Sequence, residues 1–210
     1  MPSLPHNPIT GQSNPSQSRV DQAQEYSAEE RQLLLRLAHD AIESLVLGRK
    51  PPVPTTGPHL EERRGVFTTI YRYGELRGCV GYVLPVSPLC QAVIDTARAA
   101  ASQDTRFAPV SADEVQDLRV SLSVLSLLRP IQPEEVEIGK HGLVVSMGGR
   151  RGLLLPQVPV EHGWDRVTFL EQTCRKAGLS SDAFRAGAIL ESFTAEVFGD
   201  PGGGEQQSRW

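Results

Sequence analysis

The sequence has few cysteines, no long apolar run and no excess of positive charge. Its three cysteines, with no CxxC spacing, argue against a disulfide framework and a thiolate zinc site, and nothing else points to a metal. No apolar run approaches the roughly 20 residues that span a bilayer, and the N-terminus lacks a signal-peptide pattern, so we expect a cytoplasmic protein. The net charge of -4, from 21 basic and 25 acidic residues, disfavours nucleic acid as a partner.

The composition is typical of one folded domain with flexible termini. Hydrophobic residues make up 39% and charged residues 22% of the 210 positions, which is enough to bury a core. Residues 1–27 are rich in proline, serine, asparagine and glutamine, and we expect a disordered tail there. The glycine-rich residues 199–210 are expected to be flexible as well. The folded domain is therefore expected to span residues 28–198.

Order is predicted to begin with a helix over residues 28–47. Ser27 and Glu30, three positions apart, form a capping box at its start, and Gly48 closes it. The helix precedes a proline-rich connection. We expect it to pack as an N-terminal addition to the rest of the domain.

The order strand, strand, helix, strand then occurs twice. The predicted elements are strands at 66–73 and 76–83, a helix capped by Ser87, a strand at 118–128, strands at 142–147 and 150–155, a helix capped by Asp165, and a strand at 189–198. Arg77-Gly78-Cys79 matches Arg151-Gly152-Leu153 in position, which suggests an internal duplication, although three residues can match by chance. We predict an α+β fold of two lobes, roughly 65–131 and 132–198, each with an antiparallel sheet.

The stretch GELRGCVGY, residues 74–82, is an unusual strand because it contains an arginine, a cysteine and three glycines. A two-residue turn at Gly74-Glu75, of the type II′ class, would set Arg72 opposite Arg77 and Ile70 opposite Cys79. Two arginines would then share a face with a thiol. Because like charges directly opposite are unfavourable, this pair requires an anion, either a structural carboxylate or a ligand.

Two interpretations of this strand remain open. Cationic neighbours would lower the pKa of Cys79 and favour the reactive thiolate, while Gly78 and Gly81 would leave backbone accessible to a small anion. Alternatively, Cys79 is simply buried and its glycines allow a bulge or a close crossing of another segment.

Six short motifs occur in the order seen in one known family. They are LRGCVG (76–81), DTRF (104–107), KHGL (140–143), LLLPQV (153–158), GWD (163–165) and CRKAGL (174–179). With them the chain resembles the AMMECR domain family, called AmmeMemoRadiSam system protein A in prokaryotes. Its hallmark LRGCIG differs here only by Val80, and the similarity covers about residues 28–198.

The resemblance implies a two-lobed α+β fold and a site at the hallmark motif. It implies partners of the radical-SAM and Memo-like classes, but neither an agreed activity nor a cofactor. Asp104 and Arg106 become candidate ligand-binding residues, because they lie in the loop after a helix. His141 would orient a ligand or cap a turn.

We therefore carry two hypotheses for function. In the first, the hallmark strand forms a pocket for an anionic small molecule, with Cys79 as nucleophile or covalent carrier and Arg77 and Arg72 stabilising the thiolate or the substrate. In the second, the protein is a non-catalytic adaptor, and the glycine-rich strand and LLLPQV form a docking surface for the partners.

Overall fold

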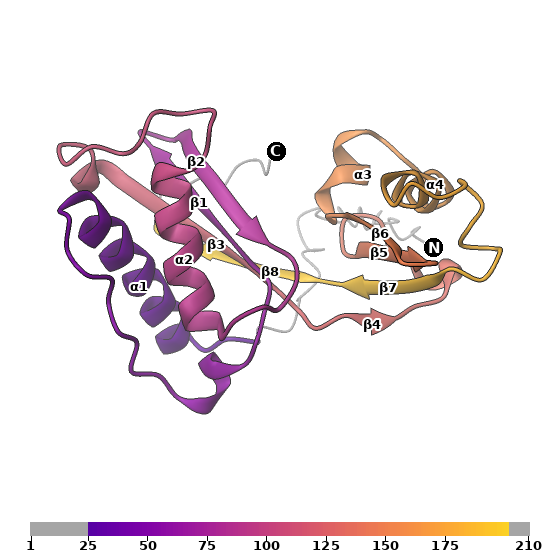
Figure 1. Cartoon of the computed structure of the whole chain (residues 1–210), viewed down its shortest axis with the longest axis horizontal. Coiled ribbons are helices and arrows are strands. Elements are labelled where there is room, and N and C mark those ends of the chain that lie inside the picture. The colour runs from indigo at the N-terminus through magenta and orange to yellow at the C-terminus, as the bar shows by residue number, and fades with distance from the viewer. Residues whose placement is uncertain (1–24, 202–210) are drawn as a thin grey trace, which may run out of the picture.

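Two antiparallel sheets organise the chain into two lobes that lie side by side (Figure 1). The computed structural model describes residues 25–201. The first lobe contains α1 (Ala28–Val46), β1 (Val66–Arg72), β2 (Glu75–Tyr82), α2 (Leu89–Ser102), β3 (Leu118–Leu125) and β8 (Ala195–Gly199). The second contains β4 (Arg129–Pro130), β5 (Gly142–Met147), β6 (Arg150–Leu154), α3 (Gln157–Glu161), α4 (Arg166–Lys176) and β7 (Ile189–Phe193). The predicted α+β class with two antiparallel sheets is confirmed.

Three of the four strands in each sheet share one topology. Their strand orders are β2-β1-β3-β8 and, counted from the opposite edge, β6-β5-β7-β4. In each, a hairpin is followed by a helix and then by a strand that pairs with the first strand of the hairpin. The doubled strand, strand, helix, strand order expected from the sequence is thus present in the fold. Three short 3₁₀ helices, Pro58–Glu61, Val115–Asp117 and Pro133–Glu135, lie in the connections.

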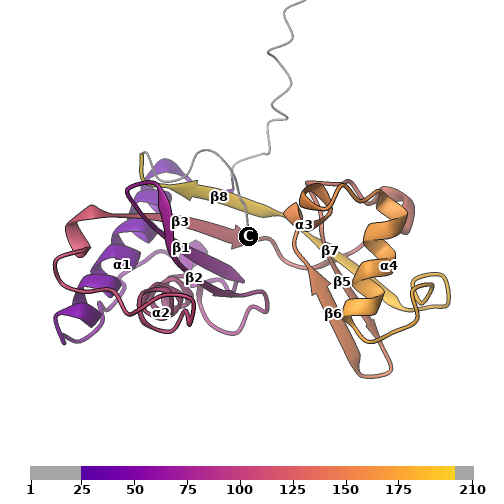
Figure 2. The same ribbon diagram turned by 90° about the horizontal axis from the view of Figure 1, so that it is seen from above.

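Within residues 25–201, the two long helices of the first lobe cover one face of its sheet. Helices α1 and α2 pack against each other on this face (Figure 2). Inward residues of β1 and β3, such as Ile70 and Leu122, are fully buried beneath them. On the same face the hydroxyls of Thr68 and Thr96 lie 2.8 Å apart, so these two buried groups satisfy each other. The opposite face of the sheet remains available for a site.

Local capping explains where α1 and α4 begin. The Ser27 hydroxyl accepts the Glu30 amide at 3.2 Å and the Glu30 carboxylate accepts the Ser27 amide at 2.9 Å, which confirms the predicted capping box. Asp165 caps α4 by accepting the Thr168 amide at 2.8 Å, also as predicted. For α2 the expectation was wrong by one residue, because Pro88 rather than Ser87 is the N-cap and no side chain caps this helix.

The last predicted strand proves to be two strands in different sheets. The expected strand at 189–198 breaks at Thr194, so β7 pairs in the second sheet while β8 returns to pair with β3 in the first. The Ser126 amide donates to the Thr194 carbonyl at 2.9 Å, and the Thr194 amide donates to the Ser126 hydroxyl at 3.0 Å. The first lobe therefore takes residues from both ends of the domain.

The ends of the folded region extend slightly beyond the expected bounds. Tyr26 is 2% exposed, and its ring stacks on His59 at a centroid distance of 5.0 Å. At the other end, the Asp200 carboxylate accepts the Val120 amide at 2.7 Å. The remainder of the two expected tails, residues 1–24 and 202–210, lies outside the described residues. Between them, no helix is long and apolar enough to cross a membrane.

Candidate functional site

The turn before the hallmark strand differs from the prediction by one residue. Tyr73 and Gly74 both have positive φ, 53° and 83°, which is the requirement of a type I′ turn rather than the expected type II′ turn at Gly74-Glu75. This turn and the adjacent bulge together place Cys79 opposite Thr69, not Ile70. The register shifts between Ile70 and Tyr71, so Arg77 has no directly opposed residue.

The anion required by the two arginines is a carboxylate of the protein itself. The guanidinium of Arg77 donates to both oxygens of Glu114, each at 2.9 Å, and Arg72 donates to the same carboxylate at 3.0 Å. Hydrogen bonds from Arg77 lower the pKa of Glu114 to about 2. Arg77 also donates to the Ala108 carbonyl at 2.8 Å, so these groups fasten the loop before β3 to the hairpin. Neither arginine lines the cavity described below.

The motif glycines permit close packing. A Cβ added at Gly78 would lie closer than 3.0 Å to the Ala100 carbonyl of α2, a separation that real Cβ atoms essentially never show. At the matching position in the second lobe, a Cβ added to Gly152 would meet the backbone of Ala177 just as closely. In both lobes, glycine thus lets the second hairpin strand approach the helix. A Cβ at Gly81 would collide with Phe67, whose ring occupies the space that the missing side chain leaves.

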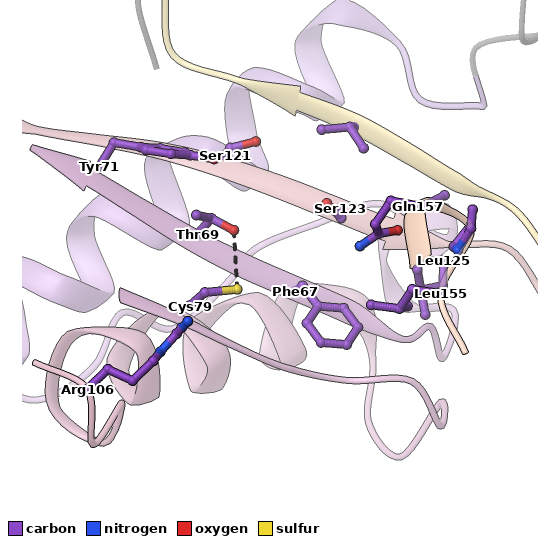
Figure 3. A pocket seen from close by; sticks show the side chains of 13 residues that line it. Phe67, Thr69, Tyr71, Cys79, Arg106, Ser121, Ser123, Leu125, Leu155 and Gln157 are labelled. Atoms are coloured by element: carbon purple, nitrogen blue, oxygen red, sulfur yellow. Dashed lines mark hydrogen bonds between the residues drawn. The ribbon is translucent and has the colours of Figure 1, made fainter. Parts of the chain in front are cut away.

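A cavity of about 230 Å³ lies on the uncovered face of the first sheet, against the second lobe (Figure 3). Its walls come from β1, β2, β3 and β8, from the DTRF loop and from the LLLPQV segment between β6 and α3. The polar lining side chains are Thr69, Tyr71, Cys79, Arg106, Ser121, Ser123 and Gln157. The apolar lining residues are Phe67, Leu125, Leu155, Pro156, Ala195 and Val197.

A row of small polar side chains crosses the cavity floor. Cys79, Thr69 and Ser121 lie on adjacent strands at paired positions. The Thr69 hydroxyl donates to the Cys79 sulfur at 3.4 Å (Figure 3). The hydroxyls of Ser121 and Ser123 have no hydrogen-bond partner among residues 25–201, so they are available to a bound molecule.

Arg106 and Cys79 are brought together by Asp104. Cys79 belongs to an edge strand, and its outward amide donates to Asp104 Oδ2 at 2.8 Å. The same carboxylate accepts Arg106 Nε at 2.9 Å and Nη2 at 2.7 Å. These bonds hold the pKa of Asp104 far below its usual range, with the Arg106 hydrogen bond as the largest cause. The Asp104 side chain is only 6% exposed, whereas the Arg106 side chain remains 52% exposed.

The electrostatics at Cys79 do not favour the activated thiolate of the first interpretation. Burial raises the pKa of the Cys79 thiol above its ordinary value. The Thr69 hydrogen bond and the charge of Arg106 lower it, but Asp104 opposes them. Because Arg72 and Arg77 are engaged by Glu114, the thiol is not surrounded by cations as the sequence suggested. The largest of these contributions, burial, therefore disfavours the thiolate form of Cys79.

The candidate residue in the second lobe does not join this site. The Nδ1 atom of His141 accepts the Glu137 amide at 3.1 Å, so His141 caps a turn, one of the two roles expected of it. It does not line the cavity, where sequence reasoning had missed Tyr71, Ser121 and Gln157. The part of the chain that the structure describes has no cluster of three or more histidine, cysteine, aspartate or glutamate side chains able to hold a metal.

Comparisons with known proteins identify the family. The AMMECR1 family profile matches residues 35–198. A protein of Methanosarcina acetivorans is 43% identical over 180 residues, covering 80% of this chain and 90% of its own length. A protein of Thermococcus gammatolerans is 44% identical over 181 residues, with coverage of 80% and 88%. The crystal structure of an uncharacterized protein from Pyrococcus horikoshii has 43% identity and a TM-score of 0.64, covering 80% of this chain and 90% of that one. The chain belongs to the AMMECR1 family.

Proposed function

We propose that this protein binds a small organic anion in the cavity between its lobes, with Arg106 as the anion-binding side chain. One observation carries the proposal: a guanidinium fixed by the Asp104 carboxylate lines a cavity whose floor offers two serine hydroxyls that have no hydrogen-bond partner within residues 25–201. Such a pocket, apolar with a few convergent polar groups, is the usual form of a small-molecule site.

The hydrogen bonds of Arg106 leave it able to bind an anion. Two of its five N–H groups donate to Asp104, which holds the guanidinium in place before a ligand arrives. The remaining N–H groups can donate to an anion, and Figure 3 shows the side chain directed toward Cys79. Hydrogen bonds to charged groups are roughly twice as strong as neutral ones, so a fixed guanidinium supplies both affinity and orientation.

Cys79 is better suited to contact the ligand than to attack it. Partial burial raises the pKa of its thiol, and among the described residues no histidine, aspartate or glutamate lines the cavity to accept the proton. The thiol and the Thr69 hydroxyl instead offer hydrogen bonds next to Arg106. Nucleophilic or carrier chemistry at Cys79 would need a base supplied by the ligand or a partner.

An adaptor for radical-SAM and Memo-like partners is the competing proposal. Gly78 cannot form its docking surface, because this residue is buried under α2. The LLLPQV segment remains as a surface for this role, since Leu155, Pro156 and Gln157 lie at the cavity between the lobes. An adaptor would capture these partners equally well with Arg106 intact or replaced.

The test is an NMR titration of the isotope-labelled protein with benzoate, using neutral benzamide for comparison. We expect benzoate to shift the amide signals of Thr69, Cys79 and Ser121, and Arg106→Gln to weaken binding by about tenfold or more. Arg119→Gln removes an exposed arginine that lies outside the cavity lining, and should leave binding unchanged. Equal benzoate affinity of Arg106→Gln and the wild type would refute the proposal.

A further inference from the structure

We infer that the anion is a monocarboxylate with an apolar tail, and that the tail lies toward the second lobe. This inference rests on the proposed function, since it names the ligand class of the same cavity. Two features of the cavity carry it: how much positive charge it contains, and how polar and apolar groups are distributed along its strands.

The charge of the cavity suits a single negative charge. Arg106 is the one cationic side chain among the described lining residues, and the carboxylate of Asp104 already accepts two of its N–H groups. A phosphate monoester carries about -1.5 to -2 charges at neutral pH and three strong acceptor oxygens. Such groups are usually held by several cations or by backbone amides at a helix N-terminus. A carboxylate needs only the outer edge of Arg106 and one or two hydroxyl donors.

The floor of the cavity changes from polar to apolar along the strands. The paired row nearest Arg106 contains Cys79, Thr69 and Ser121. The next row contains Phe67, Ser123 and Val197, and the row after it Leu125 and Ala195.

The apolar end of this floor lies against the second lobe. Leu155 and Pro156 of that lobe line the cavity there, and Figure 3 places Leu155 beside Leu125 and away from Arg106. A ligand with its carboxylate at Arg106 would therefore extend its apolar part between the two lobes. Each methylene buried in this region should tighten binding by about fourfold.

The test is isothermal titration calorimetry of the full chain with acetate, butanoate, hexanoate, hexyl phosphate and hexan-1-ol. We expect affinity to rise along the three carboxylates by up to about fourfold per methylene. Hexanoate should bind at least about tenfold more tightly than hexyl phosphate or hexan-1-ol.

Three variants measure separately how the carboxylate and the apolar tail of the ligand contribute to affinity. Arg106→Gln should weaken all three carboxylates by a similar factor of about ten or more. Leu155→Asn should reduce the gain from acetate to hexanoate without affecting acetate itself. Arg119→Gln should bind all the probes like the wild type, and circular dichroism confirms that each variant is folded.

The outcomes distinguish this inference from the proposed function. If hexyl phosphate binds tighter than hexanoate and still depends on Arg106, the cavity is an anion site but the carboxylate class is wrong. If affinity does not rise with chain length, the apolar tail is wrong. If no anionic probe binds through Arg106, both the inference and the proposed function fail.

Discussion

Replacing Gly78 by alanine tests whether this motif glycine serves packing or ligand binding. The new methyl group would lie closer than 3.0 Å to the Ala100 carbonyl, whereas ordinary contact begins at 3.4 Å. Strand β2 and helix α2 would have to separate, and Ala100 is itself only 2% exposed. Overpacking of this kind costs about 1–3 kcal/mol, and a collision with backbone belongs at the upper end. We therefore expect a loss of about 3 kcal/mol in the free energy of unfolding.

Urea denaturation followed by circular dichroism measures this loss. For a domain of this size, about 3 kcal/mol corresponds to a fall of roughly 6–12 °C in Tm. Gly57→Ala is the matched control, because a Cβ there meets nothing within 4 Å, and it should stay within about 0.5 kcal/mol of the wild type. A Gly78→Ala protein that is as stable as the wild type but no longer binds benzoate would refute the packing role and restore a ligand role.

The remaining predictions concern the charged groups and the thiol. Glu114→Gln leaves Arg77 without its counter-charge and Arg72 with Asp117 alone, and it should cost about 3 kcal/mol of stability, with anion binding unaffected; a loss below 1 kcal/mol in urea denaturation would contradict this. The pKa of Glu114 is about 2 in the folded protein, against an ordinary value of 4.5. The contribution of this carboxylate to stability is therefore complete above pH 4.5 and is lost as the pH falls toward 2. Measuring the free energy of unfolding as a function of pH would test this loss. Alkylation of Cys79 by iodoacetamide should be slow at neutral pH, with its inflection at a higher pH than that of free cysteine; an inflection at a lower pH than that of free cysteine would show an activated thiol. Asp104→Asn removes a negative neighbour and should move that inflection downward.

Capping signals predicted two of the three expected helix starts correctly. The Ser27 and Glu30 capping box and the Asp165 cap predicted helix starts correctly, because each depends on hydrogen bonds within one turn of helix. The repeated order of elements predicted two similar sheets. Alternation of apolar residues could not show that the chain changes sheets at Thr194, because such a pattern does not indicate which strand a segment pairs with.

The candidate site was predicted only in part, for a related reason. The turn was placed one residue late because glycine at its first position is typical of type II′, whereas here Tyr73 itself adopts a positive φ. That single shift, together with the bulge at Arg77, changed which residues face Cys79. The role of Glu114 as partner of both arginines depends on a contact between distant segments, which spacing along the chain does not encode.

A crystal structure of the protein grown with hexanoate tests the central claim most directly. We predict its carboxylate within hydrogen-bond distance of the Arg106 guanidinium, next to the Cys79 thiol and the Thr69 hydroxyl, with Arg77 still bound to Glu114. A carboxylate bound instead at Arg77 or Arg72, in place of Glu114, would contradict this prediction. It would place the anion site at the two arginines that lie outside the cavity lining.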